Sequence, residues 1–274
     1  MTAEIGWPGG RKVAALVTVA LELWSPGHWP VYAPMAAAWP LPGVDDPHST
    51  SWVEYGVTTG IRRLLDVLGD LPATVGVNGL VAERNPGTVA AVHNAGHEIA
   101  AHSWAQDVVP ALLDVEAERE NIRRCTELIG QVTGVRPTGW ISPRATGSQH
   151  TPALLTQAGY RWTGDHGDHD LPQLLATAHG PLVSLMHSDH SDVRSVAAGP
   201  HAYRDLHLEL LDQLLAAPGP GLFHLTVHAH VGGRPPLAGM VAQILDRVRA
   251  SGDIWTATHA QVAEHVLTHQ GRES

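Results

Sequence analysis

The most regular hydrophobic pattern in the chain is an uninterrupted apolar run from Val13 to Leu21. The run is rich in β-branched residues, which is typical of a strand buried on both faces of a parallel sheet. It ends at a single acidic residue, Glu22. We therefore predict a buried strand here, with a carboxylate at its carboxyl end.

Shorter apolar runs alternate with helical patterns along the rest of the chain. We predict further strands at 73–77, 99–101, 140–141, 160–163, 182–186, 222–227 and 254–256. We predict helices at 56–68, 86–95, 114–131, 152–158, 203–215, 237–248 and 258–265. This alternation predicts an α/β fold with a parallel sheet, and we expect one domain over residues 1–274. The pattern alone leaves a closed barrel and an open, doubly wound sheet as alternatives.

Residues 24–52 follow neither pattern. They contain six prolines and four of the nine tryptophans, without a helical or alternating period, which indicates a long ordered loop. Tryptophans carry large apolar areas that a monomer rarely exposes as one patch. We expect this Trp/Pro-rich segment to form a wall over a pocket, a contact between subunits, or both.

Polar residues follow the predicted strands directly. They are Glu22, His102, Arg144, Asp165, His187 and His228. In a βα barrel these strand ends open on one face, so we expect one pocket to gather them.

Composition narrows the class of protein. The chain is 43% hydrophobic and 16% charged, as expected of a globular protein, and its formal net charge of −10 argues against nucleic acid and anionic membranes as partners. We find no apolar run long enough to span a membrane. One cysteine, Cys125, cannot form an intramolecular disulfide, and the amino terminus lacks a leader pattern, so we expect a cytoplasmic location.

The segment from Gly96 to Trp104 reads GHEIAAHSW. It resembles the second motif of the polysaccharide deacetylases (the NodB-homology or carbohydrate esterase family 4 fold), usually G-H-E-I-x-x-H-[ST]-x-x-H. Further matches to that family are Glu54-Tyr55-Gly56, Gly139-Trp140 with Arg144, Asp170-Leu171-Pro172, Ser191-Asp192, and Val227-His228 with Gly233-Arg234-Pro235. The set resembles the branch that contains metal-independent allantoinases and peptidoglycan-deacetylase-like proteins. The resemblance implies a distorted (β/α)7-8, TIM-like barrel.

Two positions depart from the family pattern. The first motif, usually T-F-D-D, reads Ala20-Leu21-Glu22-Leu23, and the last histidine of the second motif is replaced by Gln106. An amide oxygen binds zinc poorly, so the implied metal ligands are reduced to His102 and Glu22, both weak candidates. We predict that no metal is required, or that a divalent ion binds weakly, with zinc as the first candidate.

The resemblance implies hydrolysis of a carbon–nitrogen bond other than a peptide bond, in a small amide, a ureide or an N-acetyl sugar. Such a reaction needs a base for water, a group for the oxyanion and an acid for the leaving nitrogen. The resemblance assigns these roles to Glu22, to Arg144 or a bound metal, and to His228. His230 is a reserve candidate. We expect His102, Trp140, Asp165 and Trp24 to contact the substrate.

Each of these assignments has an alternative. Glu22 could form a salt bridge with a lid, Arg144 could pair with Asp165 or Asp168, and His228 could be a core histidine. The chain as a whole could be a catalytically weak binding protein that kept the pocket. A homo-oligomer is also consistent with the tryptophan-rich segment.

Overall fold

The computed structural model describes residues 6–186, 190–195 and 198–270, and its strands form a nine-stranded sheet. The strands are β1 (Val13–Leu21), β2 (Thr74–Val77), β3 (Glu98–Ala101), β4 (Gly139–Trp140), β5 (Trp162–Thr163), β6 (Gln173–Thr177), β7 (Gly180–Ser184), β8 (Gly221–His228) and β9 (Ile254–Ala257). The predicted bounds of β1 are confirmed, and all nine of its residues are buried.

The strand order is β6-β7-β5-β4-β3-β2-β1-β8, and β9 pairs with β1 beside β2. All pairs are parallel except the hairpin of β6 and β7. Among the described strands, β6 and β8 stand at the two ends of this order and are not paired with each other. The expected distorted βα barrel is therefore confirmed, as a half-barrel that stays open between its outer strands. The sequence prediction missed β6, the antiparallel strand.

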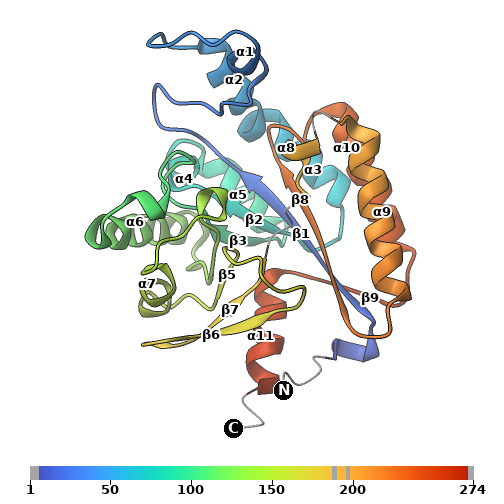
Figure 1. Ribbon diagram of the computed structural model, residues 1–274. Coiled ribbons are helices and arrows are strands. Elements are labelled where there is room, and N and C mark those ends of the chain that lie inside the picture. The colour runs from blue at the N-terminus through green and yellow to red at the C-terminus, as the bar shows by residue number, and fades with distance from the viewer. Residues whose placement is uncertain (1–5, 187–189, 196–197, 271–274) are drawn as a thin grey trace.

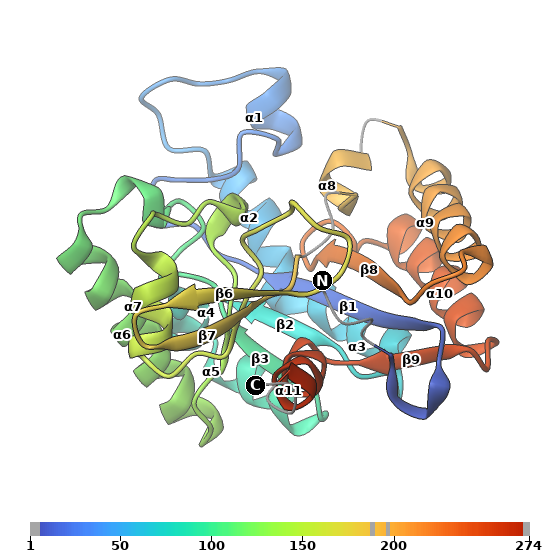
Figure 2. The ribbon, with the colours of Figure 1, turned by 60° about the horizontal axis from the view of Figure 1, so that its bottom comes forward.

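Helices cover the outside of the sheet (Figures 1 and 2). The α-helices are α1 (Pro34–Ala38), α2 (Pro47–Tyr55), α3 (Ile61–Leu68), α4 (Gly79–Arg84), α5 (Pro86–Asn94), α6 (Val115–Thr133), α7 (Thr151–Gln157), α8 (Asp192–Ser195), α9 (Pro200–Ala216), α10 (Pro235–Arg249) and α11 (His259–Gln270). Four short turns complete the set: η1 (Pro8–Gly10), η2 (Gly56–Gly60), η3 (Pro110–Leu112) and η4 (Pro143–Ala145). In the described part of the chain, no helix is both long and apolar enough to cross a membrane.

The period of two along β1 decides which side chains reach the barrel interior. Val13 and every second residue after it pack in the core between sheet and helices. Ala14 and Leu16 pack in a second core inside the barrel, and the next residues on that face, Thr18, Ala20 and Glu22, line a cavity. The alternation of β1 thus places Glu22 at the mouth of the barrel.

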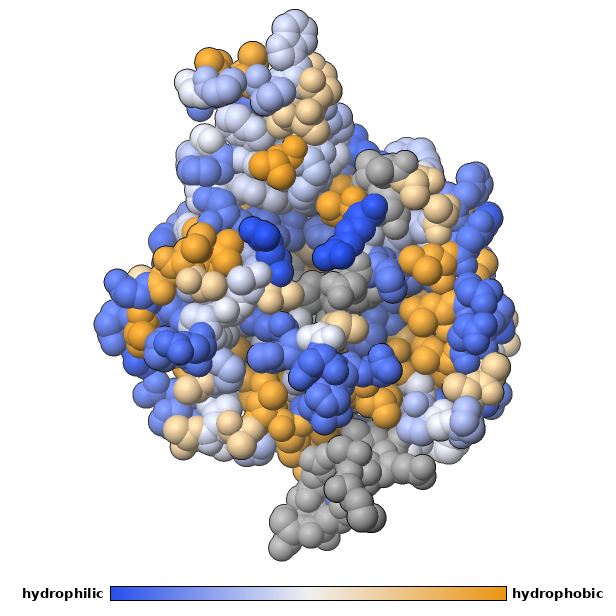
Figure 3. Space-filling view, in the orientation of Figure 1, coloured by the Kyte–Doolittle hydropathy of each residue, from blue (hydrophilic) through white to orange (hydrophobic). Residues whose placement is uncertain are grey.

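The segment at 24–52 is not a plain loop, which corrects our prediction. It contains α1 and most of α2, and α2 has a regular start: Asp46 accepts a hydrogen bond from the Ser49 backbone N–H at 3.0 Å, and Pro47 occupies the first turn. The segment lies at the top of Figure 1, beside the carboxyl end of β1, and forms the projection at the top of Figure 3. Its tip exposes apolar side chains, among them Val31 and Trp39 at 85% and 72%.

The predicted helix at 56–68 begins with a π turn, η2, which joins α2 to α3 without a break. The turn brings the backbone of η2 against the loop after β8. A Cβ atom at Gly60 would lie 1.9 Å from the Ala229 carbonyl oxygen, and one at Gly56 would lie 2.9 Å from the His230 nitrogen. Only glycine allows this approach, so η2 fixes the position of the loop that carries His230, directly after His228 at the end of β8.

Candidate functional site

A cavity of about 450 Å³ opens at the carboxyl ends of the strands. Five of the residues that we singled out at strand ends line it: Glu22, His102, Arg144, Asp165 and His228. His187, the sixth, lies outside the described residues. The structure therefore brings together in one place side chains that are up to 206 residues apart in the sequence, since Glu22 and His228 are both lining residues.

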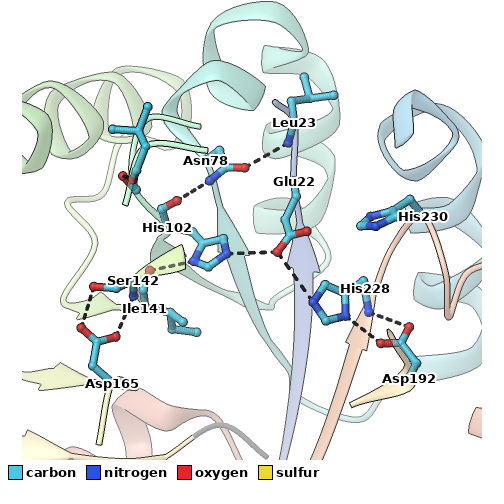
Figure 4. Close-up of polar contacts among 12 residues, drawn as sticks. Glu22, Leu23, Asn78, His102, Ile141, Ser142, Asp165, Asp192, His228 and His230 are labelled. Atoms are coloured by element: carbon cyan, nitrogen blue, oxygen red, sulfur yellow. Dashed lines mark hydrogen bonds and ion pairs between the residues drawn. The ribbon is translucent and has the colours of Figure 1, made fainter. Parts of the chain in front are cut away.

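Glu22 lies at the centre of the polar contacts (Figure 4). Its side chain is only 1% exposed, and its Oε1 atom lies 3.2 Å from His102 Nε2 and 3.7 Å from His228 Nε2. Its Oε2 atom is buried and has no hydrogen-bond partner among the described residues. One oxygen is thus held between two imidazoles, and the other keeps its capacity to accept a proton.

The charge state of Glu22 follows from two opposing effects. Burial raises the pKa of the carboxyl group, but the positive charge of His228 and the hydrogen bond with His102 lower it to about 2. Glu22 is therefore a carboxylate at neutral pH.

His228 is held from behind by Asp192, a residue at the start of α8 that is fully buried. The His228 Nδ1 atom lies 2.7 Å from Asp192 Oδ1, and the His228 backbone N–H donates to Asp192 Oδ2 at 2.9 Å. Burial lowers the pKa of His228, but the charges of Glu22 and Asp192 outweigh it and raise the pKa to about 9. At neutral pH the ring carries protons on both nitrogens, and its Nε2 atom is the one that faces Glu22.

His102 is oriented by backbone. Its Nδ1 atom donates to the Ile141 carbonyl oxygen at 2.7 Å, so its Nε2 atom points to Glu22. Asn78 ties the same two strand ends together, because its Oδ1 accepts from the Leu23 backbone N–H at 3.0 Å and its amide donates to the His102 carbonyl oxygen. Asn78 directly follows the strand predicted at 73–77, as Glu22 and His102 follow theirs, but the sequence analysis did not single it out.

The family resemblance implies a metal ion, and the residues around Glu22 are the ones that would hold it. The orientation of His102, with Nδ1 on a carbonyl, is usual for a metal-ligating histidine, and Gln106 offers a buried Oε1 atom without a partner among the described residues. However, the Leu23 side chain packs in the core, and the described residues contain no group of three His, Cys, Asp or Glu side chains placed to hold a metal. One imidazole, one carboxylate and one amide oxygen do not fit a tightly held zinc ion.

Arg144 lies on η4 at the exposed rim of the cavity. Its backbone has a φ of 60° and that of Ala145 a φ of 52°, both in the left-handed region that non-glycine residues rarely adopt. Its guanidinium group forms no hydrogen bond or ion pair with any described residue, so the alternative of a fork on Asp165 or Asp168 does not hold in this structure. Asp165 instead accepts hydrogen bonds from the Ser142 backbone N–H at 2.7 Å and hydroxyl at 2.6 Å.

Two tryptophans that we expected at the substrate lie elsewhere. Trp140 is fully buried, donates from Nε1 to the Ser142 hydroxyl at 2.9 Å, and packs edge-on against Tyr160. Trp24 packs edge-on against His230 at 5.7 Å and does not line the cavity. Trp140 therefore supports Ser142, which in turn holds Asp165, and Trp24 supports His230.

Tyr32 is a lining residue that the sequence analysis missed, because it lies in the aperiodic 24–52 segment. Its hydroxyl lies 3.2 Å from Nε2 of His230, a fully buried residue, and the two rings stack at an interplanar angle of 17°. The ring of Trp52 packs edge-on against both. The base of the 24–52 segment thus forms one wall of the cavity.

Comparisons with known proteins agree with this fold. The family model described as polysaccharide deacetylase matches residues 45–163. A peptidoglycan deacetylase of Helicobacter pylori is 23% identical over 84% of this chain and 92% of its own. A solved structure from Mycobacterium smegmatis, provisionally named a polysaccharide deacetylase, is 29% identical with a TM-score of 0.83 and covers 98% of this chain and 95% of its own. The PuuE allantoinase structure, 23% identical, has a TM-score of 0.87 over 97% of this chain and 93% of its own, which shows the shared fold.

Proposed function

We propose that the chain is a member of the polysaccharide deacetylase family and that it hydrolyses the carbon–nitrogen bond of an amide or ureide, with Glu22 as general base and His228 as general acid. The family and the fold support a hydrolase that acts on carbon–nitrogen bonds. The roles of individual residues rest on the geometry of the cavity.

One observation carries the proposal: Glu22 and His228 face each other inside the cavity in complementary protonation states. Glu22 is an anion with a free oxygen, and His228 is a cation whose Nδ1 proton is held by Asp192. A base without a proton and an acid with one are the starting state that amide hydrolysis requires. A binding protein has no need of both, and neither the site nor the relatives favour the alternative of a catalytically weak binder.

The reaction follows from these two groups. Glu22 takes a proton from water while the water oxygen forms a bond to the carbonyl carbon, and the carbonyl π electrons move to oxygen to give a tetrahedral oxyanion. The oxyanion then collapses, the carbon–nitrogen bond breaks, and the Nε2 proton of His228 passes to the leaving nitrogen. Asp192 does not change its protonation state; it holds the imidazole through Nδ1. His102 and Asp165 line the cavity and are the residues we assign to substrate contact.

We infer the substrate class from the size of the cavity. A volume of about 450 Å³ is within the ordinary range for small-molecule sites, which supports an N-acetyl sugar, a ureide or another small amide. The peptidoglycan deacetylase among the relatives supports an N-acetylated sugar, whether free or at the end of a longer glycan. The cytoplasmic location stays a prediction of the sequence.

We further propose that catalysis needs no tightly held metal, because the donor set around Glu22 is too weak for one. We also propose that the chain forms a homo-oligomer. It is supported by the apolar side chains that the tip of the 24–52 segment exposes, including Met35 and Leu41 at 43% and 52%.

Turnover assays on N-acetyl sugars, ureides and simple amides test the proposal. We expect activity in at least one class, and we expect Glu22→Gln and His228→Asn each to lower kcat by about 10²- to 10⁴-fold, the usual contribution of a general acid or base. Glu83→Gln is the matched control, because Glu83 is a half-exposed carboxylate whose ion pair among the described residues is with Arg124 on the surface. If the protein bound one of these compounds but turned over none of them, the hydrolase proposal would be abandoned in favour of the binding protein.

A further inference from the structure

The reaction needs a hydrogen-bond donor for the oxyanion, and Arg144, the residue the sequence suggested, lies exposed at the rim. Other donors must therefore be sought inside the cavity. Tyr32 is one, since its side chain lines the cavity together with Glu22 and His228. It comes from the wall formed by the 24–52 segment and not from a strand end.

The Tyr32 ring is held firmly although it belongs to a largely exposed segment. It stacks on His230, with 6.1 Å between ring centroids, and contacts the edge of Trp52 at 6.2 Å. His230 is itself packed against Trp24 and against His228, whose ring centroid lies 5.7 Å away. The phenol is thus fixed in position relative to the proposed acid.

His230 determines what the Tyr32 hydroxyl can do. Burial lowers the pKa of His230 to about 4, even though Glu22 has the opposite effect, so the ring is neutral and carries one proton. Its Nδ1 atom is buried without a hydrogen-bond partner among the described residues, and its Nε2 atom contacts the Tyr32 oxygen at 3.2 Å. With the proton on Nε2, His230 donates to the Tyr32 oxygen and leaves the hydroxyl proton free to point into the cavity.

The hydroxyl stays a donor across the working pH range. Burial raises the pKa of Tyr32, and the negative charges of Glu22 and Asp192 raise it further. A neutral, fixed donor beside the water-activating carboxylate is the arrangement that stabilises an oxyanion without reorganisation.

We infer that the Tyr32 hydroxyl donates a hydrogen bond to the carbonyl oxygen under attack and to the oxyanion formed on it, and that His230 is the positioning residue that aims it. The inference rests on the proposed function, because it assigns the oxyanion of that reaction to a donor. It makes the 24–52 segment a contributor to the chemistry and not only a wall.

Tyr32→Phe tests the inference, because it keeps the stacked ring and removes only the hydroxyl. Loss of one oxyanion donor lowers kcat by about 10²- to 10³-fold, and we expect KM to change by less than about threefold. The matched control is Tyr55→Phe: Tyr55 lies in the neighbouring helix, and its hydroxyl contacts the Gly233 carbonyl oxygen and Arg63 outside the cavity. A Tyr32→Phe enzyme with unchanged kcat, or with only a raised KM, would overturn the inference.

His230 has its own pair of variants. His230→Gln places an amide N–H near the former Nε2 atom and is expected to keep kcat within about tenfold, whereas His230→Leu is expected to match Tyr32→Phe. Because His230 is buried, the melting temperature of both variants is measured alongside. Equal losses in a folded Gln variant and a folded Leu variant would show that His230 does not aim the hydroxyl.

Binding of methylphosphonate separates this inference from the proposed function. This tetrahedral anion imitates the adduct of water with an acetyl group and can be titrated into the protein by calorimetry without any turnover. We expect the wild type and Tyr55→Phe to bind it equally and Tyr32→Phe to bind it about tenfold or more weakly, as for the loss of a hydrogen bond to a charged group. Tyr32-dependent binding without turnover of any amide would overturn the proposed reaction and keep the anion site, whereas absence of binding to the wild type would overturn the inference.

Discussion

The two sides of the cavity differ in how firmly their side chains are held. On one side, Glu22 and Asp192 are buried, His228 lies between them with its side chain 16% exposed, and charge-assisted contacts of 2.7–3.7 Å link the three. On the other, Arg144 stands exposed on a backbone with positive φ and has no polar partner for its guanidinium among the described residues. The buried side is organised before any substrate arrives, so its protonation states can be read from its contacts. Arg144 at the exposed rim can contribute only through the contacts that it makes with the substrate.

Replacing Asp192 should break this contrast most severely. In Asp192→Asn the amide can present a donor to His228 Nδ1, which favours the wrong tautomer and removes the charge that keeps the ring protonated. We expect kcat to fall by about 10³-fold, and the alkaline limb of the pH profile to move to lower pH. The control is Asp212→Asn, an exposed partner of Arg247. Retention of full activity in Asp192→Asn would remove His228 from the role of acid.

The pH dependence of activity sharpens the same point. The reaction needs ionised Glu22 and protonated His228, so kcat/KM should stay level through neutral pH and fall tenfold per pH unit above about pH 9. A midpoint near 6.5, the ordinary pKa of histidine, would show that Glu22 and Asp192 do not hold the proton on His228.

The same two groups predict the pH dependence of stability. The pKa of His228 is higher in the folded state, so its contribution is complete below about pH 6.5 and is lost as pH rises through about 9. The pKa of Glu22 is lower in the folded state, so its contribution is present above about pH 4.5 and is lost as pH falls towards 2. Chemical denaturation of the wild type and His228→Asn at pH 7 and pH 10 checks the first part; the difference between the two proteins should shrink at pH 10.

The exposed rim should respond much less. We expect Arg144→Ala to raise KM by about fivefold or less and to leave kcat nearly unchanged, because an exposed guanidinium contributes on the order of 1 kcal/mol to a contact. Steady-state kinetics of Arg144→Ala and Arg144→Lys measure this. A loss in kcat as large as that of Asp192→Asn would mean that Arg144 folds into the cavity on binding and that the two sides are equally catalytic.

Metal removal should have the smallest effect. With one imidazole, one carboxylate and one amide oxygen as donors, any divalent ion is readily stripped, and we expect kcat to be the same before and after dialysis against a chelator. Elemental analysis of the purified protein accompanies the assay. Near-stoichiometric zinc, with activity lost on chelation and restored by the metal, would show that Gln106 is a better ligand than its chemistry suggests.

The sequence predicted the scaffold of the buried side well. The apolar run of β1 and the period of two along it place Glu22 on the interior face. These features depend on residues that are adjacent in the sequence, so the local hydrophobic pattern predicts them.

The rest depends on contacts between distant residues. Asp192 was visible only as half of a Ser-Asp pair, because its function comes from His228, 36 residues away. Trp140 lies at a strand end, yet its ring points into the core. The hydrophobic pattern of the sequence does not show which way the ring points. Tyr32 and the π turn η2 were not predicted, because each is specified by its packing on the loop after β8 and not by any period of its own.

The π turn has a consequence for the evolution and engineering of the chain. A π turn contains one residue more than the α-helical turn that would replace it. Deleting one residue within 56–60 would therefore let residues 47–68 form one regular α-helix. That helix would be better hydrogen-bonded, but α2 would turn by about 100° around the helix axis relative to α3, as follows from 3.6 residues per turn. Trp52 would then swing away from Tyr32 and His230. The extra residue of η2 therefore sets the rotation of α2 relative to the barrel. Its removal would leave a folded chain in which the 24–52 segment is misplaced relative to the cavity.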